Sequence, residues 1–383
     1  MVANESALAG LGELETCAPM TASGQPDEAM HARKRWTSGV AGQALTMAVA
    51  SAGGLGFQAA GIPGGAMSGS VLIVALLAYF GWATPIGTVL RIAAMAITGM
   101  SVGSAIDPET LRNMGNYPAS IAIMAVCVVA ITTSSMAVSN LISRWPRPTS
   151  FLAAVPGSMA YILSISLSLG ADPPRVVIVQ MIRVIFLVVL LPIIIVLESD
   201  AHLGPITGIA NDPPLVLLGT AIASLALGLV FLRFKMGGGM IFGSVIASGL
   251  IHVSGLATGR VPFELMVVGQ IMIGAWAGSR FADFDWALFG RTLGASTLAI
   301  GTSLGVALVF ATFASNFLDM PFGATLIAYA PGGLEAMVVL ALALGIDPLF
   351  VSAHHFARYF LINLSLPFII QWLMKREGKD AAK

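Results

Sequence analysis

The sequence predicts an all-α polytopic membrane protein made of two inverted repeats, each with about five transmembrane helices and one re-entrant, broken hairpin. Composition is the first reason: 57% of residues are hydrophobic and 10% charged, against about 25% charged in an ordinary soluble domain. Apolar stretches near 20 residues also recur about ten times, long enough to cross a hydrocarbon core of about 30 Å. Finally, one pattern occurs twice, 174 to 175 residues apart.

The repeat is clearest in two interrupted segments and in the helices that follow them. Pro156-Gly157-Ser158 returns as Pro331-Gly332-Gly333, and Arg183 returns as Arg358. Other pairs at this offset are Leu169-Gly170 with Leu344-Gly345, Asp172-Pro173 with Asp347-Pro348, Gly65/Gly69 with Gly239/Gly243, and Gly99/Gly103 with Gly274/Gly278. A doubled apolar chain with an interrupted segment and a buried cation in each half is the plan of many secondary transporters.

The predicted order begins with a polar tail at 1–36, which has no apolar signal region and is expected to be disordered and cytoplasmic. Repeat 1 covers 37–198, a linker 199–212, repeat 2 213–374, and a second cytoplasmic tail 375–383. The crossing helices are expected at 37–60, 67–83, 85–105, 117–142, 174–196, 213–232, 237–255, 263–281, 292–317 and 349–373.

The segments 149–172 and 321–347 decide the topology, because each has a Pro-Gly pair between short apolar arms. They can be crossing helices or re-entrant hairpins. With two hairpins, fourteen of the 19 Lys and Arg residues lie on the cytoplasmic side and two outside; with two crossings the division is ten to six. The positive-inside rule therefore favours hairpins, inverted repeats and cytoplasmic termini.

The two Pro-Gly turns, at Pro156-Gly157-Ser158 and Pro331-Gly332-Gly333, are candidate walls of a substrate site. Non-helical backbone at membrane depth is tolerated only where protein buries it or where it lines a water-filled cavity. The helix after each turn also begins with free N–H groups that attract an anion. The alternative is a pair of proline kinks between packed helices.

Arg183 and Arg358 are the strongest candidates for binding a solute. Each lies about ten residues into its helix, about 15 Å along the axis and close to the bilayer midplane. A cation at that depth is costly and needs an anionic partner. The partner can be a substrate carboxylate or phosphate, which matches the guanidinium fork. The alternative is a structural contact with Glu335 or a hairpin carbonyl.

Further polar candidates lie on the second hairpin and on the two helices that follow the hairpins. Glu335, whose repeat counterpart is Ala160, is the expected coupling group, because a carboxyl in a low-dielectric pocket can carry a proton. The alternatives are a helix N-terminal charge or a salt bridge to Arg358. His354 and His355 align with Val179 and Gln180; one histidine is expected to be structural, and the other can share the pocket with Arg358 and Gln180.

Several site classes are not expected. Cys17 and Cys127 are the only cysteines, so neither a disulfide framework nor a thiolate metal site is predicted. Adjacent helical histidines point about 100° apart and do not form a metal pair. The zero net charge gives no reason to expect nucleic acid. No catalytic residues, metal or organic cofactor are predicted. The spaced glycine pairs are expected to let helices approach closely.

The repeated Pro-Gly-(Gly/Ser), Asp-Pro, Arg and Pro pattern resembles the bacterial AbrB-duplication membrane family over roughly residues 40–375. The segment from Ala330 through Asp347-Pro348 to Arg358 is most similar. The resemblance implies a protein of the bacterial inner membrane with a duplication and an indirect effect on gene expression, as the family label "transition state regulator" suggests. A second label, ammonia monooxygenase, has no support in these residues, which offer no histidine or cysteine cluster for copper or iron.

The expected function is that of a secondary transporter, not an enzyme, moving a small anionic solute, a carboxylate above all, by alternating access coupled to H⁺ or Na⁺. Its partners are the solute and the lipid bilayer, and a homodimer is the expected assembly by analogy with other hairpin-containing transporters. One alternative is a membrane sensor that alters gene expression indirectly. The weakest is a membrane monooxygenase with a metal held by His252, His354, His355 and Glu335.

Overall fold

In the computed structural model, residues 39–106, 115, 117–157, 159–166, 169–198, 210–234 and 238–380 are described. The predicted tail 1–36, Ser158, most of the predicted linker and residues 381–383 lie outside these ranges. Within them all regular structure is helical, apart from one isolated β-bridge between Asn211 and Arg260. The predicted all-α class is therefore confirmed for the described residues.

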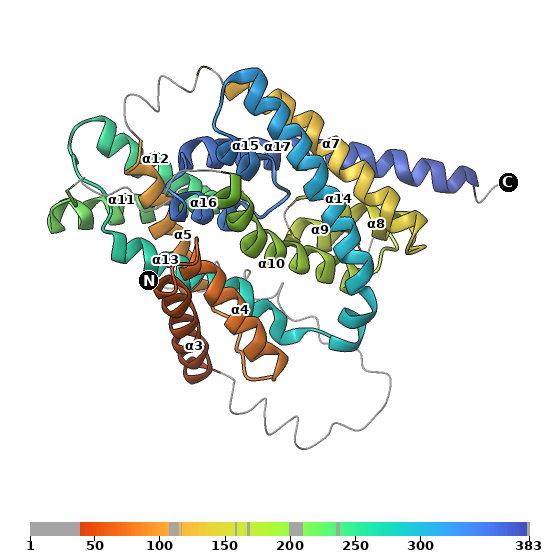
Figure 1. The fold of residues 1–383 in the computed structure, drawn as a ribbon, viewed down its shortest axis with the longest axis horizontal. Coiled ribbons are helices and arrows are strands. Elements are labelled where there is room, and N and C mark those ends of the chain that lie inside the picture. The colour runs from red at the N-terminus through yellow and green to blue at the C-terminus, as the bar shows by residue number, and fades with distance from the viewer. Residues whose placement is uncertain are drawn as a thin grey trace, which may run out of the picture.

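Six of the described helices are long and apolar enough to cross a membrane: α3 (Val40–Ala59), α7 (Tyr117–Leu141), α10 (Pro173–Glu198), α11 (Pro214–Arg233), α13 (Phe263–Ser279) with η2 (Arg280–Asp283), and α14 (Trp286–Leu318). Shorter apolar helices are α4 (Gly65–Tyr79), α5 (Thr88–Gly103) and α12 (Gly239–Val253). This set is that of a membrane-embedded protein. Figure 1 shows α7 and α14, which pack together, running side by side across one part of the molecule.

The largest differences from the predicted helix boundaries are at α14 and at the last helix. α14 begins at Trp286, six residues early, because the Asp285 carboxylate accepts hydrogen bonds from the backbone N–H groups of Ala287 (2.9 Å) and Leu288 (3.0 Å) and so caps the helix. The last helix, α17 (Pro348–Asp380), continues past the predicted end at 373, so most of the predicted C-terminal tail is helical.

Each interrupted segment forms two short helices: α8 (Arg147–Ala154) with α9 (Met159–Ser166), and α15 (Phe322–Tyr329) with α16 (Leu334–Ala343). Eight to ten residues make helices of about 12 to 15 Å, roughly half of the hydrocarbon core. The ends of each pair meet: Thr149 Oγ1 accepts from the Asp172 N–H at 3.0 Å, and a Cβ on Gly323 would lie 3.1 Å from Ile346 Cδ1. Both segments therefore fold back as helical hairpins.

The direction of two repeat-equivalent helices is set by their contacts. α5 and α13 occupy the same position in the two repeats. A Cβ on Gly269 of α13 would lie 2.9 Å from Ile97 of α5, while the Val261 N–H before α13 donates to Ser104 Oγ after α5 at 3.4 Å. Residue numbers rise along one helix as they fall along the other, so α5 and α13 run antiparallel.

The spaced glycines let helices pack closely, as the sequence predicts. A Cβ on Gly99 would lie 2.5 Å from the Ile241 carbonyl oxygen in α12, and one on Gly103 2.7 Å from the Gly249 nitrogen. In the second repeat a Cβ on Gly274 would meet the Met67 carbonyl oxygen of α4 at 2.8 Å, and one on Gly278 the Val71 carbonyl oxygen at 2.8 Å. Backbone atoms cannot yield as flexible side chains can, so α5 and α12, and α13 and α4, need glycine at these contacts.

We expect Gly99→Ala and Gly274→Ala to lower the thermal midpoint of the detergent-purified protein, with a loss of about 1–3 kcal/mol each from overpacking. Gly301→Ala and Gly305→Ala are matched controls in α14, because a Cβ at either position meets nothing within 4 Å. These controls should be neutral or stabilising by up to about 1 kcal/mol, as alanine is the better helix former. Four equal midpoints would contradict the packing role.

Candidate functional site

Arg358 holds the second Pro-Gly turn. The Asp347 carboxylate caps α17 by accepting from the N–H groups of Leu349 (2.9 Å) and Phe350 (3.1 Å), so the Asp-Pro motif sets where the helix starts and how deep Arg358 lies. Its side chain is 3% exposed. Its two terminal nitrogens donate to the carbonyl oxygens of Ala330 and Gly332, each at 2.5 Å. The turn interrupts the helix, so these carbonyls lack helical partners; the Ala330 carbonyl oxygen also accepts from the Gly332 N–H at 2.8 Å.

Arg183 and Gln180 hold the first turn in a related way. Arg183 donates to the Ala154 carbonyl oxygen at 3.5 Å and to the Gln180 side-chain oxygen. Gln180 Nε2 donates in turn to the Leu152 and Val155 carbonyl oxygens, both at 3.1 Å. The Gln180 side-chain amide and the Arg183 guanidinium thus satisfy the last carbonyls of α8, much as Arg358 does at the other turn. At both turns the arginine therefore contacts a hairpin carbonyl, the alternative partner considered from the sequence.

The positive charges of Arg183 and Arg358 are not paired with acidic side chains in the described residues. The charge of Arg183 acts on Arg358, so the two buried guanidinium groups lie within electrostatic reach of each other. Neither forms an ion pair with an acidic side chain in the described part of the chain. Arg183 Nε is buried and has no hydrogen-bond partner there. Carbonyl dipoles offset part of the cost of two buried cations, but no formal negative charge among these residues neutralises them.

The turns approach one another through α17. A Cβ on Gly157 in the first turn would lie 3.2 Å from Ile362 Cγ2, and Ile362 is four residues, about one helical turn, beyond Arg358. Residues four apart share one face of a helix, so the first turn, held by Arg183 and Gln180, and the second turn, held by Arg358, lie beside the same face of α17. Ser158 is outside the described residues.

Glu335 lies in the first turn of α16 and lines a cavity of about 60 Å³ with Gly333, Trp276 and Arg280. The salt bridge to Arg358 considered from the sequence is not formed, and within the described ranges the Glu335 carboxylate has neither a hydrogen-bond nor an ion-pair partner. Arg358, His354, His355 and Gln180 do not line this cavity. Glu335, the expected coupling residue, therefore borders a cavity, and the other predicted residues named here do not line it.

Arg280 and Trp276 are site residues that sequence reasoning missed. The Arg280 guanidinium lies 4.3 Å from the Trp276 ring centroid, and that of Arg91 lies 5.9 Å from it, both within cation–π range. Arg280 ends a predicted span, where a basic residue reads as a topology signal. No local pattern in the sequence links it to Glu335, which is 55 residues away.

The two histidines have different roles. His354 Nδ1 donates to the Phe350 carbonyl oxygen at 2.8 Å, which leaves Nε2 to accept from the Ser120 hydroxyl at 2.9 Å. Tyr329, which contacts Ser120 at 3.0 Å, completes a buried network that joins α17, α7 and α15. Both ring nitrogens of His354 are thus engaged in this network, which fits the structural role expected for one of the two histidines.

His355 Nε2 donates to the Ile327 carbonyl oxygen at 3.0 Å, the same contact that Gln180 makes with Leu152 in the first repeat, while its Nδ1 has no described partner. We expect His355→Gln to change the free energy of unfolding by less than about 1 kcal/mol, because glutamine already makes the equivalent bond. His354→Ala should cost about 2–4 kcal/mol, from a cavity and unpaired polar groups. Thermal midpoints in detergent measure both, and equal losses would contradict the assignment.

The four side chains of the monooxygenase alternative do not meet. His252 Nε2 contacts Asp212 at 3.0 Å, His354 bonds to Ser120, and Glu335 faces its own cavity. Across the residues that the structure describes, no group of three or more His, Cys, Asp or Glu side chains could hold a metal ion.

Comparison with known proteins gives a family but no substrate. Residues 83–374 match the family described as "Transition state regulatory protein AbrB". The uncharacterised protein YhjN of Bacillus subtilis (strain 168) is 25% identical over 364 residues, covering 88% of this chain and 94% of that protein. A protein of Escherichia coli (strain K12) named as a candidate regulator, AbrB, is 24% identical over 339 residues, covering 86% and 95%. No solved structure matches. Because the family match spans most of the residues and both hairpins, the chain belongs to the AbrB family.

Proposed function

We propose that this protein is a secondary transporter of a small anionic solute, a carboxylate above all, working by alternating access and coupled to H⁺ or Na⁺. Arg183 and Arg358 attract the anion, the two Pro-Gly turns shape its site, and Glu335 carries the coupling proton; in the sodium-coupled form, unwound carbonyls hold the ion. The protein acts as a carrier and not as an enzyme, in a bacterial inner membrane with both termini cytoplasmic, as a homodimer.

One observation carries this proposal: two buried guanidinium groups lie within electrostatic reach of each other with no acidic partner among the described residues. Like charges in a low-dielectric interior repel strongly, and an anion between them would relieve that repulsion. The unpaired Arg183 Nε is a donor available to such an anion. A guanidinium has five N–H donors, so holding the turns does not exhaust either side chain.

The architecture supports a carrier. The hairpin helices of about 12 to 15 Å are too short to cross a hydrocarbon core, which favours re-entrant segments. The antiparallel course of the equivalent helices α5 and α13 favours inverted repeats, the arrangement in which alternating access exchanges the roles of two similar halves.

Uptake into proteoliposomes tests the proposal. Purified protein would be reconstituted and offered a library of radiolabelled carboxylates with an inward pH gradient, an inward Na⁺ gradient, or neither. We expect at least one carboxylate to accumulate above protein-free vesicles, and one gradient to raise its uptake. Absence of uptake for every anion in correctly reconstituted protein would overturn the proposal.

A membrane sensor is the second candidate, because one relative is named as a regulator. A sensor binds its ligand without moving it. Saturable ligand binding with no flux, together with a cytoplasmic partner recovered by crosslinking, would favour this role over transport.

A further inference from the structure

Two cavities lie at opposite ends of the same short helix, α16. The first, of about 60 Å³, touches its beginning at Gly333, Glu335 and Ala336. The second, of about 110 Å³, touches its end at Leu342 and continues to Gly345 and Ile346. Both volumes exceed the about 10–15 Å³ that a cavity needs to hold a water molecule. Both ends of a helix that is otherwise buried thus border space large enough to be wet.

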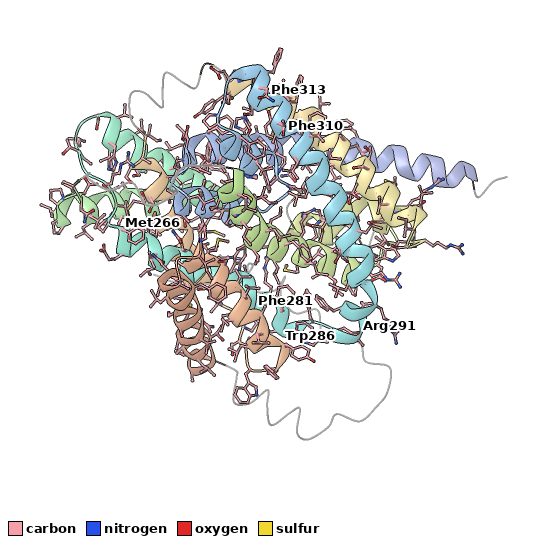
Figure 2. The ribbon with its side chains drawn as sticks, viewed as in Figure 1. Met266, Phe281, Trp286, Arg291, Phe310 and Phe313 are labelled. Carbon is pink, nitrogen blue, oxygen red and sulfur yellow. The ribbon has the colours of Figure 1, made fainter. Side chains whose placement is uncertain are left out.

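α13 lines both cavities as well. Met266, near its beginning, lines the second cavity, whereas Trp276 and Ala277, near its end, line the first. Figure 2 labels one residue of each cavity, Met266 and Phe281, and shows them well apart. The two cavities therefore follow one line through the protein, along α13 and α16.

The internal repeat relates the two cavities. Ser101 and Ala105 of the second cavity stand 175 positions before Trp276 and Arg280 of the first. The same part of the repeat unit, the end of α5 or of α13, therefore lines a cavity in each half. Because α5 and α13 run antiparallel, these equivalent cavities face opposite ends of the helix bundle.

Each cavity contains one guanidinium group. Arg280 lines the first cavity beside Glu335, and Arg260 lines the second together with Asn211, Ser101 and Ser104. A cleft with low-dielectric walls and one sign of charge raises the local concentration of the opposite ion. Arg260 gives the second cavity that character for anions, and its serine and amide groups can hydrogen-bond a carboxylate.

The separation between the cavities is short. Ala336 borders one and Leu342 the other, six residues or about 9 Å apart along α16. The residues between them, Met337–Ala341, are all at most 1% exposed. A hydrocarbon core is about 30 Å thick, so the closed part of this line is less than a third of the membrane.

We propose that the two cavities are the opposite mouths of one route for an anionic solute along α13 and α16, and that the buried segment Met337–Ala341 is the barrier between them. The proposal rests on the transport function above and adds the entry site with Arg260, Asn211, Ser101 and Ser104. α16 is bounded by the Pro331 turn and by Gly345, whose φ is 65°. Movement of α16 would connect first one cavity and then the other to the central site at Arg183 and Arg358.

Single cysteines test the route. In a background with Cys17→Ser and Cys127→Ala, four matched variants would be reacted with a membrane-impermeant anionic methanethiosulfonate from either face of oriented vesicles. Ala105→Cys lies in the second cavity, Ala277→Cys in the first, Ala341→Cys in the barrier, and Ala226→Cys on an exposed face of α11. We expect Ala105→Cys to react from one face only, Ala277→Cys from the other only, and the last two from neither.

Reaction of Ala105→Cys and Ala277→Cys from the same face, or of either from neither face in folded protein, would overturn the route. Ala336→Cys is a second reporter for the first cavity in case Ala277→Cys folds poorly. Labelling needs no solute, so an uptake assay that fails for every carboxylate would count against the transport function alone, while the labelling pattern judges the route.

The positive charge of the second cavity can be tested separately, by comparing the reaction rates of anionic and cationic reagents. At Ala105→Cys, the anionic reagent should react faster than a cationic methanethiosulfonate of similar size. Adding Arg260→Ala should lower the rate of the anionic reagent about fivefold and raise that of the cationic reagent about fivefold, the effect of one unit charge at close range in a wet site, so the rate ratio should fall about 25-fold. Arg233→Ala, an exposed arginine at the end of α11, is the control and should leave the ratio unchanged. An unchanged ratio in Arg260→Ala would contradict the role of Arg260.

Discussion

Replacing both buried arginines, in the double variant Arg183→Ala plus Arg358→Ala, should lower carboxylate uptake at least about 100-fold. Each charge-assisted hydrogen bond contributes about 1.5–3 kcal/mol, and each 1.4 kcal/mol is about tenfold in affinity, so losing even one such bond from each guanidinium gives that effect. Initial uptake rates in proteoliposomes at several solute concentrations measure it. Arg233→Ala, on the surface at the end of α11, should transport normally.

Folding must be separated from binding in this experiment, because Arg358 also satisfies the carbonyls of Ala330 and Gly332. The double lysine variant keeps both positive charges but lacks the planar fork that holds two acceptors at once. We expect it to remain monodisperse in detergent and to lose at least about tenfold in uptake. Full uptake by a well-folded double alanine variant would exclude the arginines from solute binding.

Substituting Glu335→Gln should abolish the response to a pH gradient without abolishing solute exchange. One proton moved with each solute supports about tenfold accumulation per pH unit, since one pH unit is worth about 1.36 kcal/mol. A neutral glutamine of the same shape cannot carry that proton. Wild-type vesicles should therefore accumulate solute in proportion to the gradient, while Glu335→Gln vesicles should only equilibrate internal and external solute.

Glu264→Gln is the matched control, because Glu264 also lies in the first turn of a helix, α13, but is exposed. Its accumulation should equal that of the wild type. If Glu335→Gln vesicles still concentrate solute along a pH gradient, Glu335 is not the coupling group. If a Na⁺ gradient alone drives both proteins, the coupling ion is sodium and the carboxylate has another role.

Much of the fold can be predicted from the sequence, because hydropathy and the signals that start and end helices depend on neighbouring residues. The apolar stretches gave helices near their predicted places, and the two Asp-Pro motifs cap α10 and α17. The Pro-Gly pairs interrupt helices as expected, since proline and glycine do so wherever they occur in a helical segment. The start of α14 was harder to predict, because it depends on which of two nearby acidic residues, Asp283 or Asp285, caps the helix.

The site was only partly predictable, because its important partners are backbone atoms or distant residues. A hairpin carbonyl could be named from the sequence as an alternative partner of Arg183 and Arg358, but not which carbonyls they contact. His354 and His355 cannot be told apart from the sequence. Ser120 on α7 provides a partner for the second ring nitrogen of His354, whereas Nδ1 of His355 has no described partner. That Glu335 and Arg280 line one cavity likewise follows from how α16 packs beside α13, which no local sequence pattern encodes.

The arginine contacts at the turns have a mechanical consequence. Arg358 ties the tip of the α15–α16 hairpin to α17, and Arg183 ties the tip of α8–α9 to α10, so each hairpin and its following helix should move as a single piece. Close backbone contacts at glycines hold α4 against α13 and α5 against α12. These four helices form a second body, within which little relative movement is expected. Large displacements should therefore concentrate along the seam where α16 meets α5 and α13, and covalent links placed across that seam should arrest the protein while links inside either body leave it free.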